Sequence, residues 1–173
     1  MVKRKSILKR LIWTLTVIFV LMNIVAIFHA YKFTHFAEDK TEKTKDPKKL
    51  TARQKISTLI FGVSNPRPAN DKFPSTDFET VNLSSNRRIE CWNVKVSNPK
   101  GTVILFHGFS GQKSSMLDKA EILREQGFNT LLVDFMGSGG SEGNQTTIGF
   151  LEAEQVKTCF DFVTKKGEKN IFL

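Results

Sequence analysis

The segment Thr102–Ser141 decides the fold: it opens Thr-Val-Ile-Leu-Phe-His-Gly-Phe-Ser-Gly (102–111) and closes Thr-Leu-Leu-Val-Asp-Phe-Met-Gly-Ser-Gly-Gly-Ser (130–141). At each end an apolar run of strand length leads directly into a glycine-containing turn, and a helical pattern separates the two runs. This order is typical of a β-α-β unit in a parallel sheet. Functional groups gather at the carboxyl ends of such strands, so we expect any chemistry near 107–111 and 137–141.

The flanking residues extend this unit at both ends. Alternating apolar and polar residues predict an antiparallel hairpin before it, and apolar positions at helical spacing predict a second helix after it. The expected elements are strands over 77–83, 90–96, 102–106, 129–133 and 170–173, and helices over 114–126 and from a cap at Thr146 or Thr147 to Gly167. The sequence therefore predicts an α/β fold whose five-stranded sheet is doubly wound and mostly parallel.

Residues 11–28 form an 18-residue run without a charged side chain, preceded by five basic residues within 1–10. The run is long enough to span a bilayer as a helix, and the basic flank should stay in the cytoplasm. The alternative is a cleaved signal peptide, but Ala30 has Phe28 two positions before it, which does not suit a small-x-small cleavage site. We expect an uncleaved single-pass anchor at 11–30 that binds the lipid bilayer, with the globular part extracytoplasmic.

The net charge of +9 belongs to the N-terminal region, because residues 56–173 hold 13 basic and 13 acidic side chains. A nucleic-acid-binding domain would carry the excess on its folded body, so we exclude that partner. The segment 38–53 is charged and has almost no apolar residues, which predicts a solvated tether or a juxtamembrane helix. The expected divisions are a basic cytoplasmic N-terminus at 1–10, the anchor at 11–30, a charged tether and connector at 31–70, and a globular domain at 71–173.

The sequence favours neither a cofactor nor a metal. Cys91 and Cys159 suit neither a disulfide framework nor a metal site, and we interpret them as small core thiols. The glycine turn at 137–143 departs from a dinucleotide fingerprint because Glu142 stands where the third glycine is needed. The chain also lacks the Gly-Lys-Ser/Thr sequence of a phosphate-binding loop.

Two motifs carry a resemblance to a known family. His107-Gly108-Phe109 after one strand, and Asp134-Phe-Met-Gly-Ser-Gly-Gly-Ser141 after the next, resemble the α/β-hydrolase fold. The continuation Asn144–Gly149 is similar to serine hydrolases of the monoacylglycerol-lipase-like and membrane-anchored Bem46-like groups. The resemblance covers about 77–173 and implies strands 1–5 of an α/β-hydrolase sheet, preceded here by one transmembrane helix. Met136 departs from the pattern, because that turn usually carries arginine.

The resemblance also implies roles for individual residues. The backbone N–H of Phe109 would form half of an oxyanion hole, with His107 and Gly108 as the supporting turn and His107 not the catalytic base. The second turn would be held by Asp134, Gly137, Gly139 and Ser141. The nucleophile would lie in a Gly-x-Ser-x-Gly elbow directly after the strand at 170–173, followed by the acid and the histidine. We therefore expect these three catalytic groups beyond Leu173.

Three interpretations of function stay open. The first is the N-terminal part of a membrane-anchored serine hydrolase that acts on ester, amide or similar acyl bonds of a small substrate and is inactive as this chain alone. The second is a non-catalytic, membrane-tethered binding module built on the same half-sheet. The third is a nucleotide-binding β-α-β protein. The serines of the chain's turns do not decide between them, because serine is common at turns and helix starts for capping.

Overall fold

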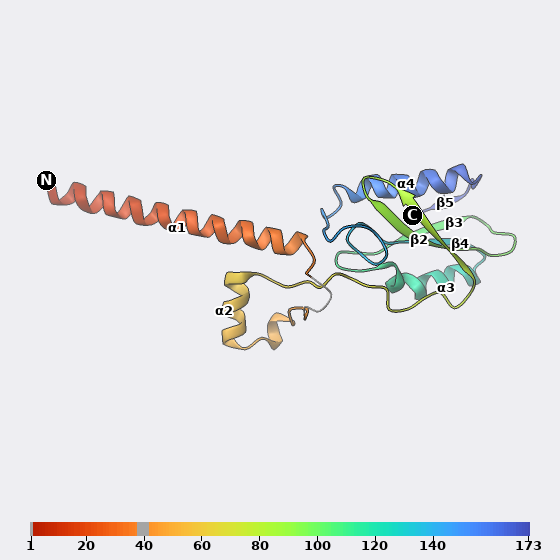
Figure 1. Ribbon diagram of the computed structural model, residues 1–173, viewed down its shortest axis with the longest axis horizontal. Helices are drawn as coiled ribbons and strands as arrows, with labels where there is room; N and C mark the ends of the chain where they lie inside the picture. The colour runs from red at the N-terminus through yellow and green to blue at the C-terminus, as the bar shows by residue number, and fades with distance from the viewer. Residues whose placement is uncertain (1, 38–41) are drawn as a thin grey trace.

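The computed structural model describes residues 2–37 and 42–173, so four residues of the predicted tether, 38–41, lie outside the described residues, as does Met1. Figure 1 shows a long N-terminal helix, α1 (Val2–Thr34), that leads to a layered α/β body. A shorter helix, α2 (Ala52–Phe61), and a 3-10 turn, η1 (Pro47–Lys49), lie on the connection between them. The division into a helical N-terminal part and a globular part is therefore visible in the backbone.

The body is built on a five-stranded sheet with the strand order β1-β2-β4-β3-β5. The strands are β1 (Phe78–Ser84), β2 (Arg88–Val94), β3 (Thr102–Phe106), β4 (Asn129–Val133) and β5 (Ile171–Phe172). β3 pairs in parallel with β4 and with β5, whereas β2 pairs antiparallel with β1 and β4. The predicted α/β sheet is confirmed, with its parallel pairings confined to β3, β4 and β5 because the β1–β2 hairpin reverses the chain.

Helices cover both faces of the sheet. In Figure 1, α4 (Glu152–Lys165) and α3 (Leu117–Glu125) lie on opposite sides of the strands. Successive strand residues alternate between the two faces. Cys91 and Val133 therefore pack with Cys159 of α4, while Trp92 and Leu132 pack with Ala120 of α3. This double cover buries β4 along its whole length and explains its continuous apolar run.

The element boundaries agree with the prediction for β3 and β4, differ by one or two residues at β1, β2 and β5, and differ also at the helices. The predicted strands 102–106 and 129–133 are confirmed to the residue. The first predicted helix begins one residue earlier, as the 3-10 turn η2 (Lys113–Met116). The prediction that Thr146 or Thr147 caps the second helix is wrong, because α4 begins at Glu152. The carboxylate of Glu152 instead accepts hydrogen bonds from both threonines.

The helix α1 extends beyond the predicted span at both ends. Its section Ser6–Thr34 is long and apolar enough to cross a membrane, and it suits a signal sequence near the N-terminus equally well. None of that section's most apolar window is buried within the protein. The helix thus presents the side chains of this window to its surroundings, and the window takes no part in the core of the body.

Backbone hydrogen bonds join the end of α1 to the body. Thr146 N–H donates to the carbonyl of Thr34 at 2.8 Å, and Phe36 N–H donates to the carbonyl of Asn144 at 2.6 Å. Ala37 forms an isolated parallel bridge with Pro66. The chain leaving α1 is therefore attached directly to the segment that follows the glycine turn.

Candidate functional site

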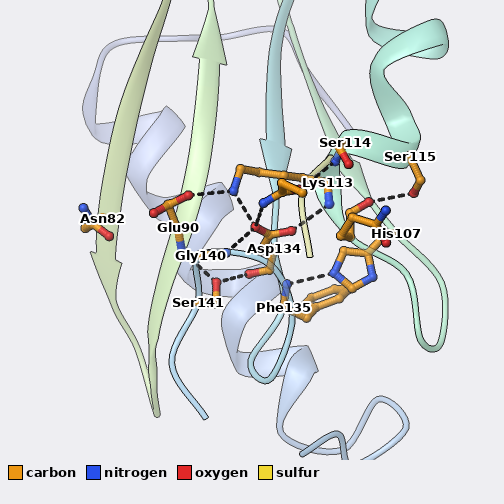
Figure 2. A network of polar contacts seen from close by, with 12 residues as sticks. Asn82, Glu90, His107, Lys113, Ser114, Ser115, Asp134, Phe135, Gly140 and Ser141 are labelled. Carbon is orange, nitrogen blue, oxygen red and sulfur yellow. Dashed lines mark hydrogen bonds and ion pairs between the residues drawn. The ribbon is translucent and has the colours of Figure 1, made fainter. Parts of the chain in front are cut away.

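The turn after β4 is organised around a buried ion cluster (Figure 2). Asp134 and Lys113 have fully buried side chains and form a salt bridge, and the Lys113 ammonium also lies 2.8 Å from Glu90 Oε1. The ammonium stands 4.3 Å from the ring centroid of Trp92, a cation–π contact. Charges removed from water in this way require close partners, because an unpaired buried charge is strongly destabilising.

The carboxylate of Asp134 is fully committed to holding the two turns. Its Oδ1 accepts from the backbone N–H of Lys113 at 2.7 Å, and its Oδ2 accepts from the N–H of Gly140 at 2.9 Å. The side-chain amide of Asn70 donates to the same Oδ2 at 2.8 Å. Because one oxygen ties η2 and the other ties the glycine turn, Asp134 fixes the two loops relative to each other. These bonds leave it poorly placed to act on a substrate.

Two glycines of the turn are required by the approach of carboxylates. A Cβ atom at Gly139 would overlap the carboxylate of Asp134, and one at Gly140 would overlap the carboxylate of Glu90. Gly139 also has a φ of +49°, a conformation that L side chains rarely adopt. The glycine-rich composition here therefore serves the ion cluster.

Ser141 belongs to the same network and is unavailable as a nucleophile. Residues 139–143 read Gly-Gly-Ser-Glu-Gly, a literal Gly-x-Ser-x-Gly match that follows β4. The Ser141 hydroxyl donates to the carbonyl of Asp134 at 2.7 Å and accepts from the N–H of Glu90 at 2.8 Å. The residue is only 2% exposed. Its proton is used for structure, and among the residues that the structure describes no side-chain base is bonded to this hydroxyl.

His107 connects the two turns through both ring nitrogens. Its Nε2 accepts from the backbone N–H of Phe135 at 3.1 Å (Figure 2), so Nδ1 carries the proton that is donated to the carbonyl of Gly108 at 2.8 Å. Burial lowers the pKa of His107 below its ordinary value. A neutral imidazole in this position joins the two turns by hydrogen bonds.

A cavity of about 280 Å³ lies between the two turns and the start of α4. Its apolar wall includes Phe36, Phe109, Met136 and Val156, with Gly108 beside them. Within residues 2–37 and 42–173, the backbone N–H of Phe109 has no acceptor in the protein. Phe109, whose backbone N–H is the predicted oxyanion donor, is thus one of the residues that line this cavity.

The end of α1 contributes to the same region. The ring of Phe109 stacks on Phe33, with centroids 4.6 Å apart and an angle of 15° between the planes. Phe36 lies 6.4 Å from Phe109 by ring centroids and is 5% exposed. The turn after β3 is therefore packed against residues of the N-terminal helix and its exit.

A carboxylate also lies at the cavity wall. Glu152 accepts hydrogen bonds from the hydroxyl of Thr146 at 2.7 Å, the N–H of Thr147 at 2.9 Å and the N–H of Gly149 at 3.0 Å. Burial alone would raise the pKa of Glu152, but the hydrogen bonds from Thr147 and Thr146 outweigh it and hold the pKa below its ordinary value. Glu152 is thus an ionised acceptor that shapes the loop 146–149.

The sequence reasoning missed three residues that hold the site. Lys113, at the start of η2, supplies the buried cation beside Asp134, and Met136 is itself buried. Asn70 bonds to Asp134, and the guanidinium of Arg67 donates to the carbonyl of Ser141 at 2.7 Å. Asp134 follows a buried strand and has no arginine beside it in the sequence, which indicates that a cation from another segment pairs with it; this was the available signal for Lys113. Nothing local to 67–70 marks these residues as partners of the glycine turn.

The sequence of the body matches a family model. Residues 97–171 match the family described as serine aminopeptidase, S33. This range contains both turns, the ion cluster's Lys113 and Asp134, and most of the cavity wall. No curated protein sequence matches the chain.

Solved structures resembling the chain include two crystal forms of the Pyrococcus furiosus esterase Pf2001. One aligns with a TM-score of 0.56 and 25% identity, over 61% of this chain and 45% of the esterase. The other aligns with a TM-score of 0.54 and 25% identity, over 58% of this chain and 41% of the esterase. The chain thus spans less than half of the length of that esterase.

Proposed function

We propose, from the premise that this chain belongs to the α/β-hydrolase family, that it is the oxyanion-turn portion of a membrane-anchored serine hydrolase acting on acyl bonds. The observation that carries the proposal is that Phe109 follows β3 in the turn 107–111, lines the cavity, and has a backbone N–H without an acceptor among the described residues. Backbone donors held rigidly at the place where negative charge develops lower the barrier to acyl transfer.

The rigidity of the turn supports this role. His107 bonds to Phe135 and Gly108, and the N–H of Gly111 donates to the carbonyl of Gly108 at 3.1 Å. Ser110 adopts a φ of +54°, so the turn is closed tightly behind Phe109. The cavity beside it is lined mainly by apolar side chains, which suits the acyl part of an ester or amide.

Direct binding to the oxyanion donor can be measured by NMR. The full chain, ¹⁵N-labelled in detergent micelles, is titrated with butyrate, whose carboxylate oxygen imitates a developing oxyanion on a short acyl chain. We expect the Phe109 amide resonance to shift downfield with saturation, while the amide of Gly127, at the far end of α3, stays unchanged. If the Phe109 resonance does not move although other cavity resonances do, the proposed role of its N–H is wrong.

We propose further that this chain alone does not hydrolyse acyl esters. The hydroxyl of Ser141 is consumed by the network, His107 is held between two turns, and the remaining histidines, His29 and His35, stand in or next to the end of α1. A nucleophile needs a base within hydrogen-bond reach. In an assay of the purified chain with a p-nitrophenyl short-chain ester, we expect the rate of the buffer alone. Turnover that a fluorophosphonate abolishes would contradict this.

We propose also that α1 crosses the bilayer, with the N-terminus in the cytoplasm and the body outside. It is supported by the length and apolar character of Ser6–Thr34 and by the basic residues before it. Expression in bacterial inner membrane followed by protease treatment of spheroplasts tests the orientation. We expect the body to be digested from the periplasmic side, with the protein resisting extraction at alkaline pH. A body that is protected, or released into the soluble fraction, would contradict the assignment.

A further inference from the structure

The helix α2 carries an apolar face that the rest of the protein leaves uncovered. Ile56, Leu59 and Ile60 follow the i, i+3, i+4 spacing of one helix face and are 60%, 71% and 47% exposed. At 100° per residue, Arg53 and Lys55 fall on the two borders of this face. An apolar arc bordered by basic residues is the pattern of helices that lie in a membrane interface.

The opposite face of α2 carries polar side chains that face another part of the chain. Gln54, Ser57 and Thr58 line a shallow groove together with the segment 42–45. The start of the helix is fixed by a capping box, in which Thr51 and Gln54 bond to each other's backbone. The polar side of α2 therefore faces the segment 42–45, and the side that carries Ile56, Leu59 and Ile60 is turned away from it.

The end of α2 lies close to the end of α1. Gly62, which ends α2, packs against α1: a Cβ at this position would lie 3.6 Å from both His29 Cδ2 and Lys32 Cβ. These residues precede the end of α1 at Thr34 by two to five positions, which corresponds to about 3–8 Å along the helix axis. In Figure 1, α2 accordingly lies beside the body end of α1 and runs across its direction.

We infer that α2 is an interfacial helix that inserts Ile56, Leu59 and Ile60 into the outer leaflet of the same bilayer that α1 crosses. The inference rests on the proposed membrane function of α1. A helix held at this level and across the direction of α1 lies in the plane of the interface, where apolar side chains reach about 5–10 Å into the boundary between headgroups and acyl chains. Arg53 and Lys55 then stand at the level of the phosphates, so anionic lipids should strengthen the contact.

Single cysteines labelled with an environment-sensitive fluorophore test this in the full chain. The variants are Leu59→Cys on the apolar face, Ser57→Cys on the polar face as the matched control, and Ile18→Cys in the middle of α1. The native thiols Cys91 and Cys159 are buried, and the unsubstituted chain measures any labelling of them. Each labelled protein is reconstituted in phosphatidylcholine vesicles with a nitroxide quencher either near the headgroup or deep on the acyl chain.

We expect the headgroup-level nitroxide to quench the label at residue 59 several-fold more strongly than the label at residue 57. Adding phosphatidylglycerol should increase this difference, and Arg53→Gln together with Lys55→Gln should remove the increase. The label at residue 18 should respond to the deep nitroxide. Failure at residue 18 contradicts the proposed span, whereas quenching at residue 18 without quenching at residue 59 overturns the interfacial helix alone. A residue-59 label shielded from aqueous iodide but not quenched by lipid would mean that protein covers this face, which also overturns the inference.

Discussion

Lys113 shows how much of the site depends on one residue. It lies in the polar run Gln-Lys-Ser-Ser after the first turn, yet its side chain is completely buried against Asp134, Glu90 and Trp92. Its backbone N–H also donates to Asp134. Since the same residue neutralises the acid and ties the two turns together, its loss should affect both.

We expect Lys113→Met to lower the free energy of unfolding by about 3–5 kcal/mol, because it leaves a buried carboxylate without its partner. Urea denaturation of the full chain in detergent micelles, with Trp13→Phe in every variant so that fluorescence reports on Trp92, measures the change. The matched control is Lys157→Met, which removes an exposed i,i+4 pair with Asp161 and should cost at most about 0.5 kcal/mol. Equal losses in the two variants would contradict the assigned role of Lys113.

The buried imidazole of His107 should make stability depend on pH. Burial lowers its folded-state pKa below 6.5, so beneath pH 6.5 the unfolded chain binds a proton that the folded chain does not. The contribution of His107 to the free energy of unfolding is complete above pH 6.5. It is lost as the pH falls from 6.5 to the folded-state pKa. The lowered pKa of Glu152 acts in a different window, since its contribution is lost only as the pH falls below 4.5.

Urea denaturation at about pH 7.5 and about pH 5.5 should therefore give a smaller loss of stability for His107→Gln than for the original chain. The glutamine side chain can still accept from Phe135, which limits the loss of structure. A variant whose stability falls with pH as steeply as that of the original chain would show that His107 does not titrate on unfolding.

At the scale of elements, the loop before α4 is held by an acid at the first position of the helix. Glu152 accepts hydrogen bonds from the hydroxyls of Thr146 and Thr147 and from the N–H groups of Thr147 and Gly149. Ile148 adopts a φ of +56° within that loop. The carboxylate also lies near the N-terminus of α4, where negative charge is favourable. The loop and the helix start therefore form one unit.

We expect Glu152→Gln to destabilise the protein by about 1.5–3 kcal/mol, because a neutral amide accepts fewer and weaker hydrogen bonds than the carboxylate. Amide hydrogen exchange should show faster exchange at Thr147 and Gly149. The corresponding change at Glu154, an exposed acid in the same first turn, should leave exchange at these amides unchanged. Unchanged protection in Glu152→Gln would mean that other contacts hold the loop.

The elements differ in how well the sequence predicts them, for physical reasons. The central strands β3 and β4 are buried on both faces, so their continuous apolar runs mark them to the residue. The start of α4 could not be found this way, because a threonine before an apolar pattern resembles a cap whether it caps the backbone or bonds to Glu152. The pairing of Lys113 with Asp134 joins residues 21 positions apart and leaves no periodic trace. The glycine turn was recognised by its composition, although the reason for its glycines appears only in three dimensions.

At the scale of the whole molecule, the two thiols report on the core. Cys91 on β2 and Cys159 on α4 are fully buried in one apolar cluster. The interaction with Cys159, together with burial, raises the pKa of Cys91. Both thiols should therefore react with a maleimide only when the body opens as a whole.

We expect Leu132→Ala, which removes buried side-chain atoms on the α3 side of the sheet, to lower stability by about 2–5 kcal/mol and to speed labelling of both thiols about 30-fold or more. The control Ile122→Ala changes a side chain that is 56% exposed and should leave the labelling rate nearly unchanged. If Leu132→Ala leaves the labelling rate of Cys159 unchanged, α4 opens separately from the sheet.

The attachment of α1 to the body has a consequence for how the protein would meet its substrate. Thr34 and Phe36 bond to residues 144–146 without an intervening free segment, and Phe33 stacks on the turn that carries the proposed donor. If α1 crosses a bilayer as proposed, the body has little freedom to rotate relative to α1. The cavity then keeps a constant distance from the lipid surface and a constant orientation toward it. Encounters would then be governed by lateral diffusion in two dimensions, so the surface density of a substrate, rather than its bulk concentration, would set the rate of capture.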